Sequence, residues 1–227
     1  MLSRQAVAQE DTINRQPAIY FPQAPVPGEW RMSLGAVFTS TPPELTEEIR
    51  LALPAIDFNI QKGVSRQFFL TGRVQTQFLQ SNLALGARWA RPINNRWFVA
   101  VGDDFAGWFG TLQIKNVFDS EAYGLQNFPH ASLGYRLTRE LQISARAEAI
   151  LDVYYRSAAG ALVVETPGWR GNGFAFTFML EQPFYKQQHV SIGLRAAYSR
   201  FNWQFWSLYS TFDRSLFYPQ LLFNFIL

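Results

Sequence analysis

The 227-residue chain has a net charge of +3, and its 16% aromatic content equals its 16% charged content. It has no stretch of about 18 to 20 apolar residues, which excludes membrane-spanning helices, and no cysteine, which excludes disulfides and thiolate chemistry. A small net charge without a basic run argues against a nucleic-acid partner.

Residues 1–29 differ in composition from the rest of the chain. Ala6-Val7-Ala8 has the small-x-small pattern that precedes a signal-peptidase cut, so we expect Met1 to begin inside a signal peptide. Residues 17–29 contain four prolines, which lack a backbone donor and favour extended conformations outside a sheet. We therefore divide the chain into two parts. Residues 1–29 are expected to be a signal-peptide remnant followed by a Pro-rich leader, which lies either in the periplasm or as a strap inside the lumen of the main domain. The main domain covers residues 30–227.

The main domain alternates apolar and polar residues with a period of two. In residues 66–79, Phe68, Leu70 and Val74 fall on one face, while Arg73 and Gln75 fall on the other. A helical period would scatter both sets, so the pattern predicts strands with one apolar face. We expect ten strands, at 31–39, 51–60, 66–79, 82–90, 96–106, 129–138, 141–155, 173–183, 189–203 and 216–227.

The connections alternate in length, which favours an all-β, transmembrane, antiparallel up-and-down barrel. Short polar turns alternate with longer connections, except that Gln80-Ser81 would form a very tight turn among the longer ones. Residues 161–166 and 203–212 could add a pair of strands, so twelve strands are the alternative to ten. The short turns lie at 61–65, 91–95, 138–140 and 185–188, and the longer connections at 40–50, 107–128, 156–172 and 204–215.

The final strand alternates up to the last residue, through Phe223, Phe225 and Leu227. This ending resembles the C-terminal assembly signal of bacterial outer-membrane β-barrels, although those proteins usually end in an aromatic residue. The resemblance covers most of residues 30–227 and points to the superfamily, not to a family within it. It implies location in the bacterial outer membrane, contact with outer-membrane lipid and recognition by barrel assembly machinery.

Tryptophans near the strand ends are expected to form the aromatic girdles found where a barrel meets lipid headgroups. Their alternative role is in an ordinary hydrophobic core. The tryptophans concerned are Trp30, Trp89, Trp97, Trp108, Trp203 and Trp206.

Nine charged residues are expected to face the lumen, five of them arginines and four of them carboxylates. An unpaired ion in a narrow, partly dry interior is costly, so these charges should pair across the lumen. The network is then either a polar plug that closes the barrel or the lining of a water-filled selective path. Its members are Asp57, Arg73, Arg88, Arg136, Arg146, Glu148, Asp152, Glu181 and Arg195.

A second group of polar residues is expected near the outer rim. Asp103 and Asp104 end one predicted strand and His130 opens the next, so a hairpin could bring a carboxylate to the imidazole. The set is similar to that of the omptin outer-membrane proteases, which implies a hydrolase with a carboxylate-oriented general base. We expect no enzyme activity as the leading interpretation, and no motif predicts a cofactor or a metal site.

Residues 107–128 depart from strict alternation. Their length and their apolar residues predict an irregular loop that folds into the pore or projects to contact lipid, the barrel wall or an envelope protein partner.

Three functions are compatible with these features of the sequence. The leading one is a small barrel with an interior of arginines and carboxylates, acting as a porin-like pore or as an anchoring subunit of an envelope complex. A barrel-embedded hydrolase using His130 with Asp103 or Asp104 is the second. A soluble lipocalin-like carrier, with the apolar strand faces turned inward, is the third.

Overall fold

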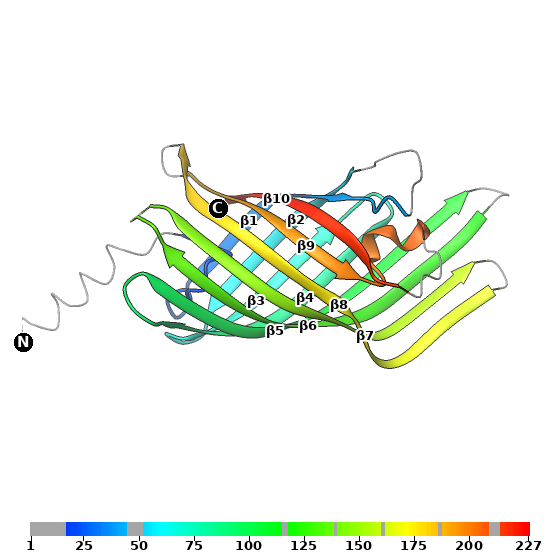
Figure 1. Cartoon of the computed structure of the whole chain (residues 1–227), viewed down its shortest axis with the longest axis horizontal. Coiled ribbons are helices and arrows are strands. Elements are labelled where there is room, and N and C mark those ends of the chain that lie inside the picture. Colours follow the sequence, from blue (N-terminus) through cyan, green and yellow to red (C-terminus); the bar gives the residue numbers. More distant parts are fainter. Residues whose placement is uncertain are drawn as a thin grey trace, which may run out of the picture.

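The computed structural model describes residues 17–44, 52–114, 118–138, 140–159, 162–185, 188–208 and 214–227. Within these ranges, ten antiparallel strands close into a barrel in which each strand pairs with its neighbours in sequence and β1 pairs with β10 (Figure 1). No helix in the described part is long and apolar enough to cross a membrane. The strands are β1 Trp30–Ser40, β2 Ala52–Gly63, β3 Phe68–Thr76, β4 Gln80–Pro92, β5 Trp97–Ile114, β6 Phe118–Arg136, β7 Gln142–Ala159, β8 Leu162–Tyr185, β9 Gln188–Ser199 and β10 Leu216–Ile226.

The predicted barrel and its count of ten strands are confirmed, and the alternative of twelve strands is wrong. Residues 162–166 continue β8 and do not form a strand of their own. Residues 203–208 form a short 3-10 helix, η1 (Trp203–Leu208), and residues 209–213 lie outside the described ranges.

The period of two places apolar side chains on the outside of the wall. Leu85 and Leu194 are 62% and 63% exposed, whereas Asp57 and Asn224 on the inner face are fully buried. A soluble carrier would bury its apolar faces, so the lipocalin-like arrangement with apolar faces inward is wrong. The large exposed apolar surface instead matches a wall that faces hydrocarbon.

The expected irregular loop at 107–128 is instead a regular hairpin. β5 and β6 pair continuously from Trp97 opposite Tyr135 to Ile114 opposite Phe118. The alternation is hidden in the sequence because several inward positions of this hairpin, such as Trp108 and Ala122, are themselves apolar and buried in a cluster with Trp206. Alternation of polarity disappears while the strand geometry remains.

A second long hairpin is formed by β7 and β8, which pair up to Ala159 opposite Leu162. The longer connection expected at 156–172 is therefore mostly strand. Both hairpins extend beyond the rest of the barrel at the end opposite the short turns, on the right of Figure 1. Bulges interrupt the register of β6, β7 and β8 below these extensions.

The predicted aromatic girdle is only half right. Trp30, Trp89 and Trp97 are exposed on the outer face near the short turns, where Trp97 packs against Tyr135 with ring centroids 4.6 Å apart. The tryptophans at 108, 203 and 206 are buried inside the barrel instead. The reason is that η1 returns into the lumen and packs against the inner face of β5.

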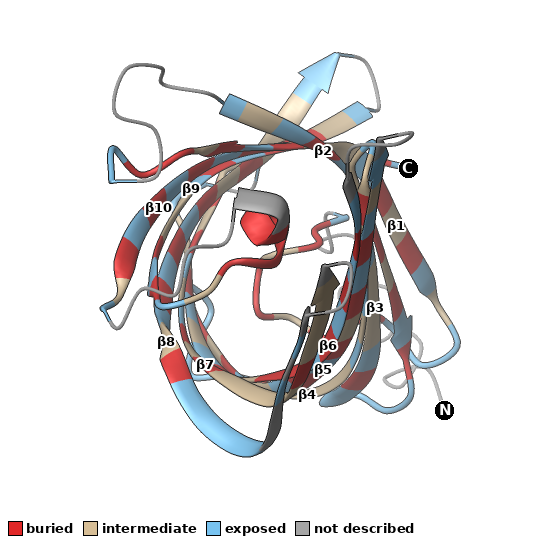
Figure 2. Ribbon diagram, turned by 90° about the vertical axis from the view of Figure 1, so that its right-hand side faces the viewer, coloured by how far each residue is buried: buried red, intermediate tan, exposed pale blue. Residues whose placement is uncertain are grey.

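Two segments occupy the lumen, one at each end. Residues 17–29, called the strap below, enter at the end with the short turns, and η1 enters at the other end (Figure 2). Ala18, Ile19 and Phe21 of the strap are each 2% exposed. Of the two expectations for the Pro-rich segment, the described part is thus a lumenal strap.

Candidate functional site

The strap is fixed to the barrel by Glu181, which lies on β8. Its carboxylate accepts hydrogen bonds from the backbone N–H groups of Ile19 (2.8 Å), Tyr20 (3.1 Å) and Phe21 (2.6 Å). The hydroxyl of Ser191 donates a fourth hydrogen bond at 2.9 Å. Glu181 therefore binds backbone donors and not the arginine that the sequence led us to expect, because the strap fills this end of the lumen.

The strap also joins the charged interior through Tyr20. Its hydroxyl donates to Asp57 at 3.1 Å, and Arg73 makes two hydrogen bonds to the same carboxylate, at 2.7 and 3.0 Å. Burial, reinforced by the charge of Asp57, raises the pKa of Tyr20 well above its usual value, so the phenol stays a neutral donor. Asn59 and Asn224 also donate to Asp57, which is fully buried.

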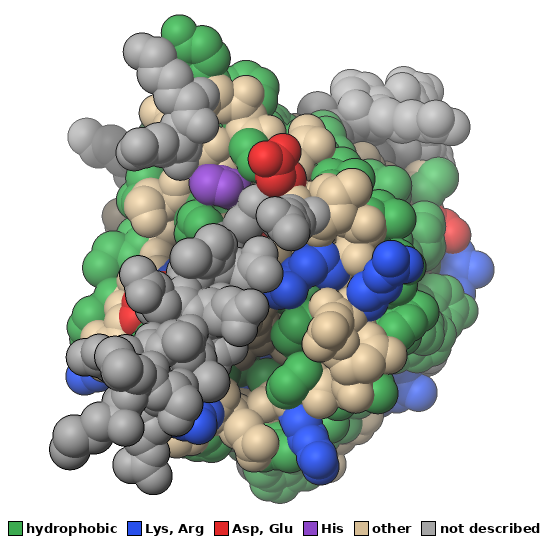
Figure 3. Space-filling view, turned by 90° about the vertical axis from the view of Figure 1, so that its left-hand side faces the viewer, with side chains coloured by type: hydrophobic (Ala, Val, Ile, Leu, Met, Phe, Trp, Pro, Cys, Tyr) green, Lys and Arg blue, Asp and Glu red, His purple; other side chains and the backbone are tan. Residues whose placement is uncertain are grey.

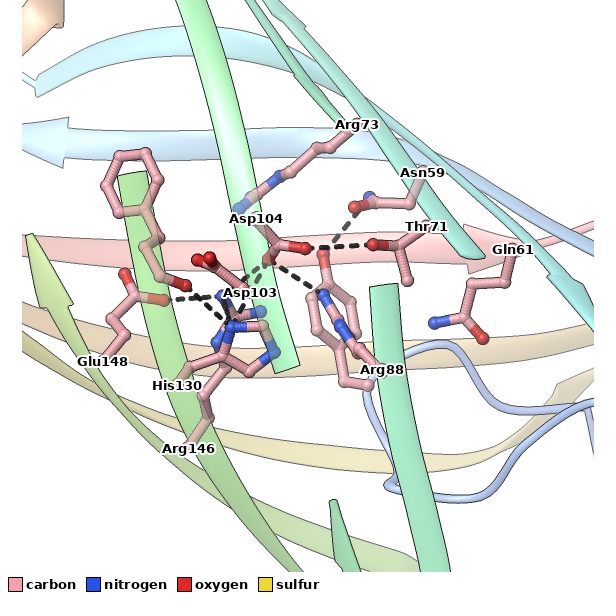
Figure 4. A network of polar contacts seen from close by, with 12 residues as sticks. Asn59, Gln61, Thr71, Arg73, Arg88, Asp103, Asp104, His130, Arg146 and Glu148 are labelled. Carbon is pink, nitrogen blue, oxygen red and sulfur yellow. Dashed lines mark hydrogen bonds and ion pairs between the residues drawn. The ribbon is translucent and has the colours of Figure 1, made fainter. Parts of the chain in front are cut away.

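Asp104 lies at the centre of the lumen between two arginines. Its carboxylate is 3.2 Å from Nη2 of Arg88 and 2.8 Å from Nη2 of Arg146, and it accepts a hydrogen bond from Thr71 at 3.0 Å (Figure 4). The parity of β5 explains this position, since even-numbered residues of that strand point inward. We had expected Asp104 at the outer rim, but β5 continues to Ile114 and places it in mid-barrel.

Glu148 extends the network to the opposite wall. It accepts from Arg146 at 2.9 Å and from the guanidinium of Arg195, which also donates to Gln220 at 2.9 Å. Six of the nine predicted lumen charges therefore form arginine and carboxylate pairs, and Asp104 must be added to them. The six are Asp57, Arg73, Arg88, Arg146, Glu148 and Arg195.

The other predicted lumen charges find different partners. Asp152 accepts from the side-chain amides of Gln126 (2.7 Å) and Asn172 (2.9 Å). Arg136 donates to Gln23 of the strap at 3.1 Å, and its guanidinium lies 4.9 Å from the ring centroid of Phe98. These contacts depend on segments that are distant in sequence, so strand parity alone does not predict them.

The expected catalytic group is only partly assembled. The side chain of His130 is fully buried, with Nδ1 2.9 Å from the carbonyl oxygen of Phe128 and 3.7 Å from Asp104. Its Nε2 faces the backbone of Gly102, where an added Cβ would lie 2.9 Å away. Asp103 is exposed on the outer face of the wall and accepts from Asn127 at 2.6 Å, so it does not meet His130.

The second lumenal segment is held by glutamines that the sequence analysis did not single out. Oε1 of Gln204 accepts from Thr39 at 2.5 Å and from Gln220 at 3.0 Å. Trp206 donates from its indole nitrogen to Gln80 at 2.8 Å. Gly110 leaves room for this indole, since an added Cβ would lie 2.0 Å from its nitrogen. η1 is thus anchored on β1, β4, β5 and β10.

A cavity of about 100 Å3 remains in the lumen between the strap and η1. Tyr20 lines it from the strap and Trp203 from η1, while four arginines and two carboxylates line its walls. Its size fits a few water molecules or one small molecule. Within the described ranges, no group of three or more histidine, aspartate or glutamate side chains is placed to hold a metal ion.

The end with the short turns carries Lys and Arg side chains spread over its surface (Figure 3). Lys62, Arg66, Arg91 and Arg96 are exposed in or beside these turns. Surface cations of this kind suit the neighbourhood of anionic groups.

No family model matches the chain, and no curated protein matches it in sequence. Solved structures do match. The translocator domain of the autotransporter NalP from Neisseria meningitidis has a TM-score of 0.48 and 7% identity over 99% of this chain and 93% of that chain. Ail, the attachment invasion locus protein of Yersinia pestis, has a TM-score of 0.41 and 12% identity over 89% of this chain and 100% of that chain. The P. putida toluene transporter TodX has a TM-score of 0.36 and 9% identity over 87% of this chain and 67% of that chain.

These likenesses assign no activity. The closed antiparallel barrel, with its apolar outer face and polar inner face, decides the fold by itself. The chain has an outer-membrane β-barrel fold.

Proposed function

We propose that the protein is a small barrel of the bacterial outer membrane whose lumen is held closed, and that it serves as an anchoring subunit of an envelope complex. The observation that carries the closed lumen is the attachment of the strap to Glu181 through three backbone hydrogen bonds. Hydrogen bonds to a charged acceptor contribute about 1.5 to 3 kcal/mol each, so the closed state is well stabilised at this end. η1 closes the other end.

The outer wall supports a membrane location. Exposed apolar side chains such as Leu85, Phe176 and Leu194 would cost roughly 25 cal/mol for each Å2 kept in water. Hydrocarbon removes that cost, and Trp97 with Tyr135 supplies an aromatic contact at one border. β10 closes the barrel on β1 and carries Phe223 and Phe225 for recognition by assembly machinery.

The β5 and β6 hairpin supports an anchoring role. Residues 107–114 and 118–128 form its distal part as paired strands, and the hairpin extends beyond the rest of the wall (Figure 1). A rigid projecting hairpin can present the exposed Thr111 and Glu121, which lie opposite each other, to an envelope protein. In this proposal the barrel holds the hairpin at a fixed height above the membrane.

The closed lumen is tested in planar lipid bilayers. Insertion of the folded protein is first verified by its requirement for detergent during extraction and by a change in gel mobility on boiling. The inserted wild-type protein should give no unitary conductance. Steady conductance steps from the wild type would overturn the closed-lumen proposal.

The anchoring role is tested separately. A photo-crosslinker at position 111 should capture a discrete envelope protein in native membranes, whereas one at Ile93 in a short turn at the opposite end should not. Identical adducts from both positions, or none from position 111, would overturn the partner proposal without affecting the closed lumen.

A selective pore that opens when both the strap and η1 leave the lumen is the second candidate. The arginines around the cavity favour it, because they would line the path between the two ends. Deletion of residues 17–29 together with residues 203–208 should then produce anion-preferring conductance in the same bilayers.

A further inference from the structure

The lumenal cavity has two chemically different parts. Arg73, Arg88, Arg146 and Arg195 line it from four different strands, which surround a common space. Near η1, the lining includes the apolar Phe128, Ile150, Phe201 and Trp203 beside the polar Ser199 and Asn202. The cavity therefore has cationic groups along its walls and apolar groups at the end near η1.

The arginines and carboxylates of this region are not paired one to one. The four guanidinium groups contact only three carboxylates, those of Asp57, Asp104 and Glu148, so that Arg88 and Arg146 share Asp104. Glu181 and Asp152 lie in the same lumen, but backbone or side-chain amides are their hydrogen-bond partners. In a space screened from water, two arginines that share one carboxylate attract a further anion strongly.

Two of these arginines also retain unused donors. The Nε atoms of Arg88 and Arg146 are buried and have no hydrogen-bond partner among the described residues. A buried donor without an acceptor is unfavourable by about 1 to 3 kcal/mol, more when it is charged. The cavity thus lies beside two guanidinium donors that have no acceptor among the described residues.

We propose that this cavity is a binding site for one small organic monoanion, a short carboxylate. Its carboxylate group lies among Arg88, Arg146 and Arg195, and its apolar end lies against Phe128 and Trp203. The volume of about 100 Å3 sets the size, because a protein cavity of about 150 Å3 accommodates benzene. A chain of three or four carbons fits this limit.

This site goes beyond the proposed anchoring role and does not depend on it. A barrel that is silent in bilayers and one that conducts after the strap and η1 leave would both contain the same arginines. Binding and conductance are measured separately, so failure of one proposal does not imply failure of the other.

The test is equilibrium dialysis of radiolabelled propionate against the full-length barrel in detergent, after refolding in the presence of propionate so that the lumen closes around it. We expect one propionate per barrel and little binding of propionamide, which has the same shape without the charge. Arg88→Gln should weaken binding by roughly tenfold or more, while Asp104 keeps its contact with Arg146. Arg96→Gln, in an exposed turn, is the matched control and should bind like the wild type.

Asp104→Asn provides an independent variant with the opposite expectation. It adds one positive charge to the region and should tighten propionate binding, provided that it keeps the gel mobility of the folded barrel. Absence of bound propionate in the wild type, equal binding of propionamide, or unchanged binding in folded Arg88→Gln would each overturn the proposal. If Asp104→Asn does not fold, the Arg88→Gln and propionamide comparisons still decide the question.

Discussion

The Glu181 carboxylate accepts the backbone N–H of Phe21 at 2.6 Å, although the two residues are 160 positions apart in sequence. The strap is a Pro-rich segment outside the sheet, so its backbone donors need partners from elsewhere in the chain. Glu181 supplies partners for three consecutive residues at once. One side chain of β8 therefore holds three consecutive residues of the strap inside the lumen.

Glu181→Gln should release the strap. An amide presents one N–H2 group where the carboxylate had an acceptor, so a donor would face a donor at Ile19, Tyr20 or Phe21. We expect a loss of about 3 kcal/mol in the free energy of unfolding, measured by urea unfolding in micelles. Glu140→Gln, at an exposed turn, should not change this free energy. A fully stable Glu181→Gln protein would contradict the role of this carboxylate.

Arg73→Met should lower the free energy of unfolding by more than the loss of the Arg73 side-chain contacts alone would. Asp57 is fully buried, and losing its bidentate partner leaves a charge in the wall at a cost of about 3 to 5 kcal/mol. The Asp57→Asn and Arg73→Met double variant should recover part of this loss, as measured by urea unfolding in micelles. If the double variant is less stable than Arg73→Met alone, the pair is not the cause.

Gly110→Ala should displace η1, because its new Cβ would lie 2.0 Å from the indole nitrogen of Trp206. The expected results are reduced stability and greater quenching of tryptophan fluorescence by acrylamide. Gly107→Ala lies on the same strand and is the control, since its Cβ would come no closer than 3.4 Å to a neighbour. Equal effects of the two substitutions would show that space at position 110 is unimportant.

Leu194→Arg tests the orientation of the wall. Leu194 is 63% exposed in the middle of β9, so an arginine there would enter the hydrocarbon and cost about 2 to 4 kcal/mol in lipid vesicles. Ile93→Arg, at a turn, replaces a side chain that is 62% exposed, and should cost less than about 1 kcal/mol. Comparable stability of both variants in vesicles would argue that β9 does not face lipid.

Much of the wall follows from the sequence because the period of a strand is a local property. Phe68, Leu70 and Val74 alternate with inward residues such as Arg73 wherever one face meets hydrocarbon and the other meets a polar lumen. The same parity placed Arg88, Arg146 and Glu148 inside before any contact was known. The turn lengths then favoured ten strands over twelve, and the structure confirms ten.

Local pattern failed where the lumen itself is apolar. Around Trp108 both faces of β5 carry apolar residues, so the sequence pattern predicts a loop there instead of a strand. A strand that ends at residue 106 places Asp104 at the rim, whereas β5 continues to Ile114 and places it in mid-barrel. Asp103 was joined to His130 by the same error, although adjacent strand residues point to opposite faces.

The sequence by itself determined a barrel of about ten strands with an apolar outside and a charged inside, because alternation along a strand needs only neighbouring residues. Only the tertiary structure decided which segments occupy the lumen. Glu181 meets the strap and Gln204 meets Thr39 across more than 150 positions, and such contacts depend on how the whole wall curves around its lumen.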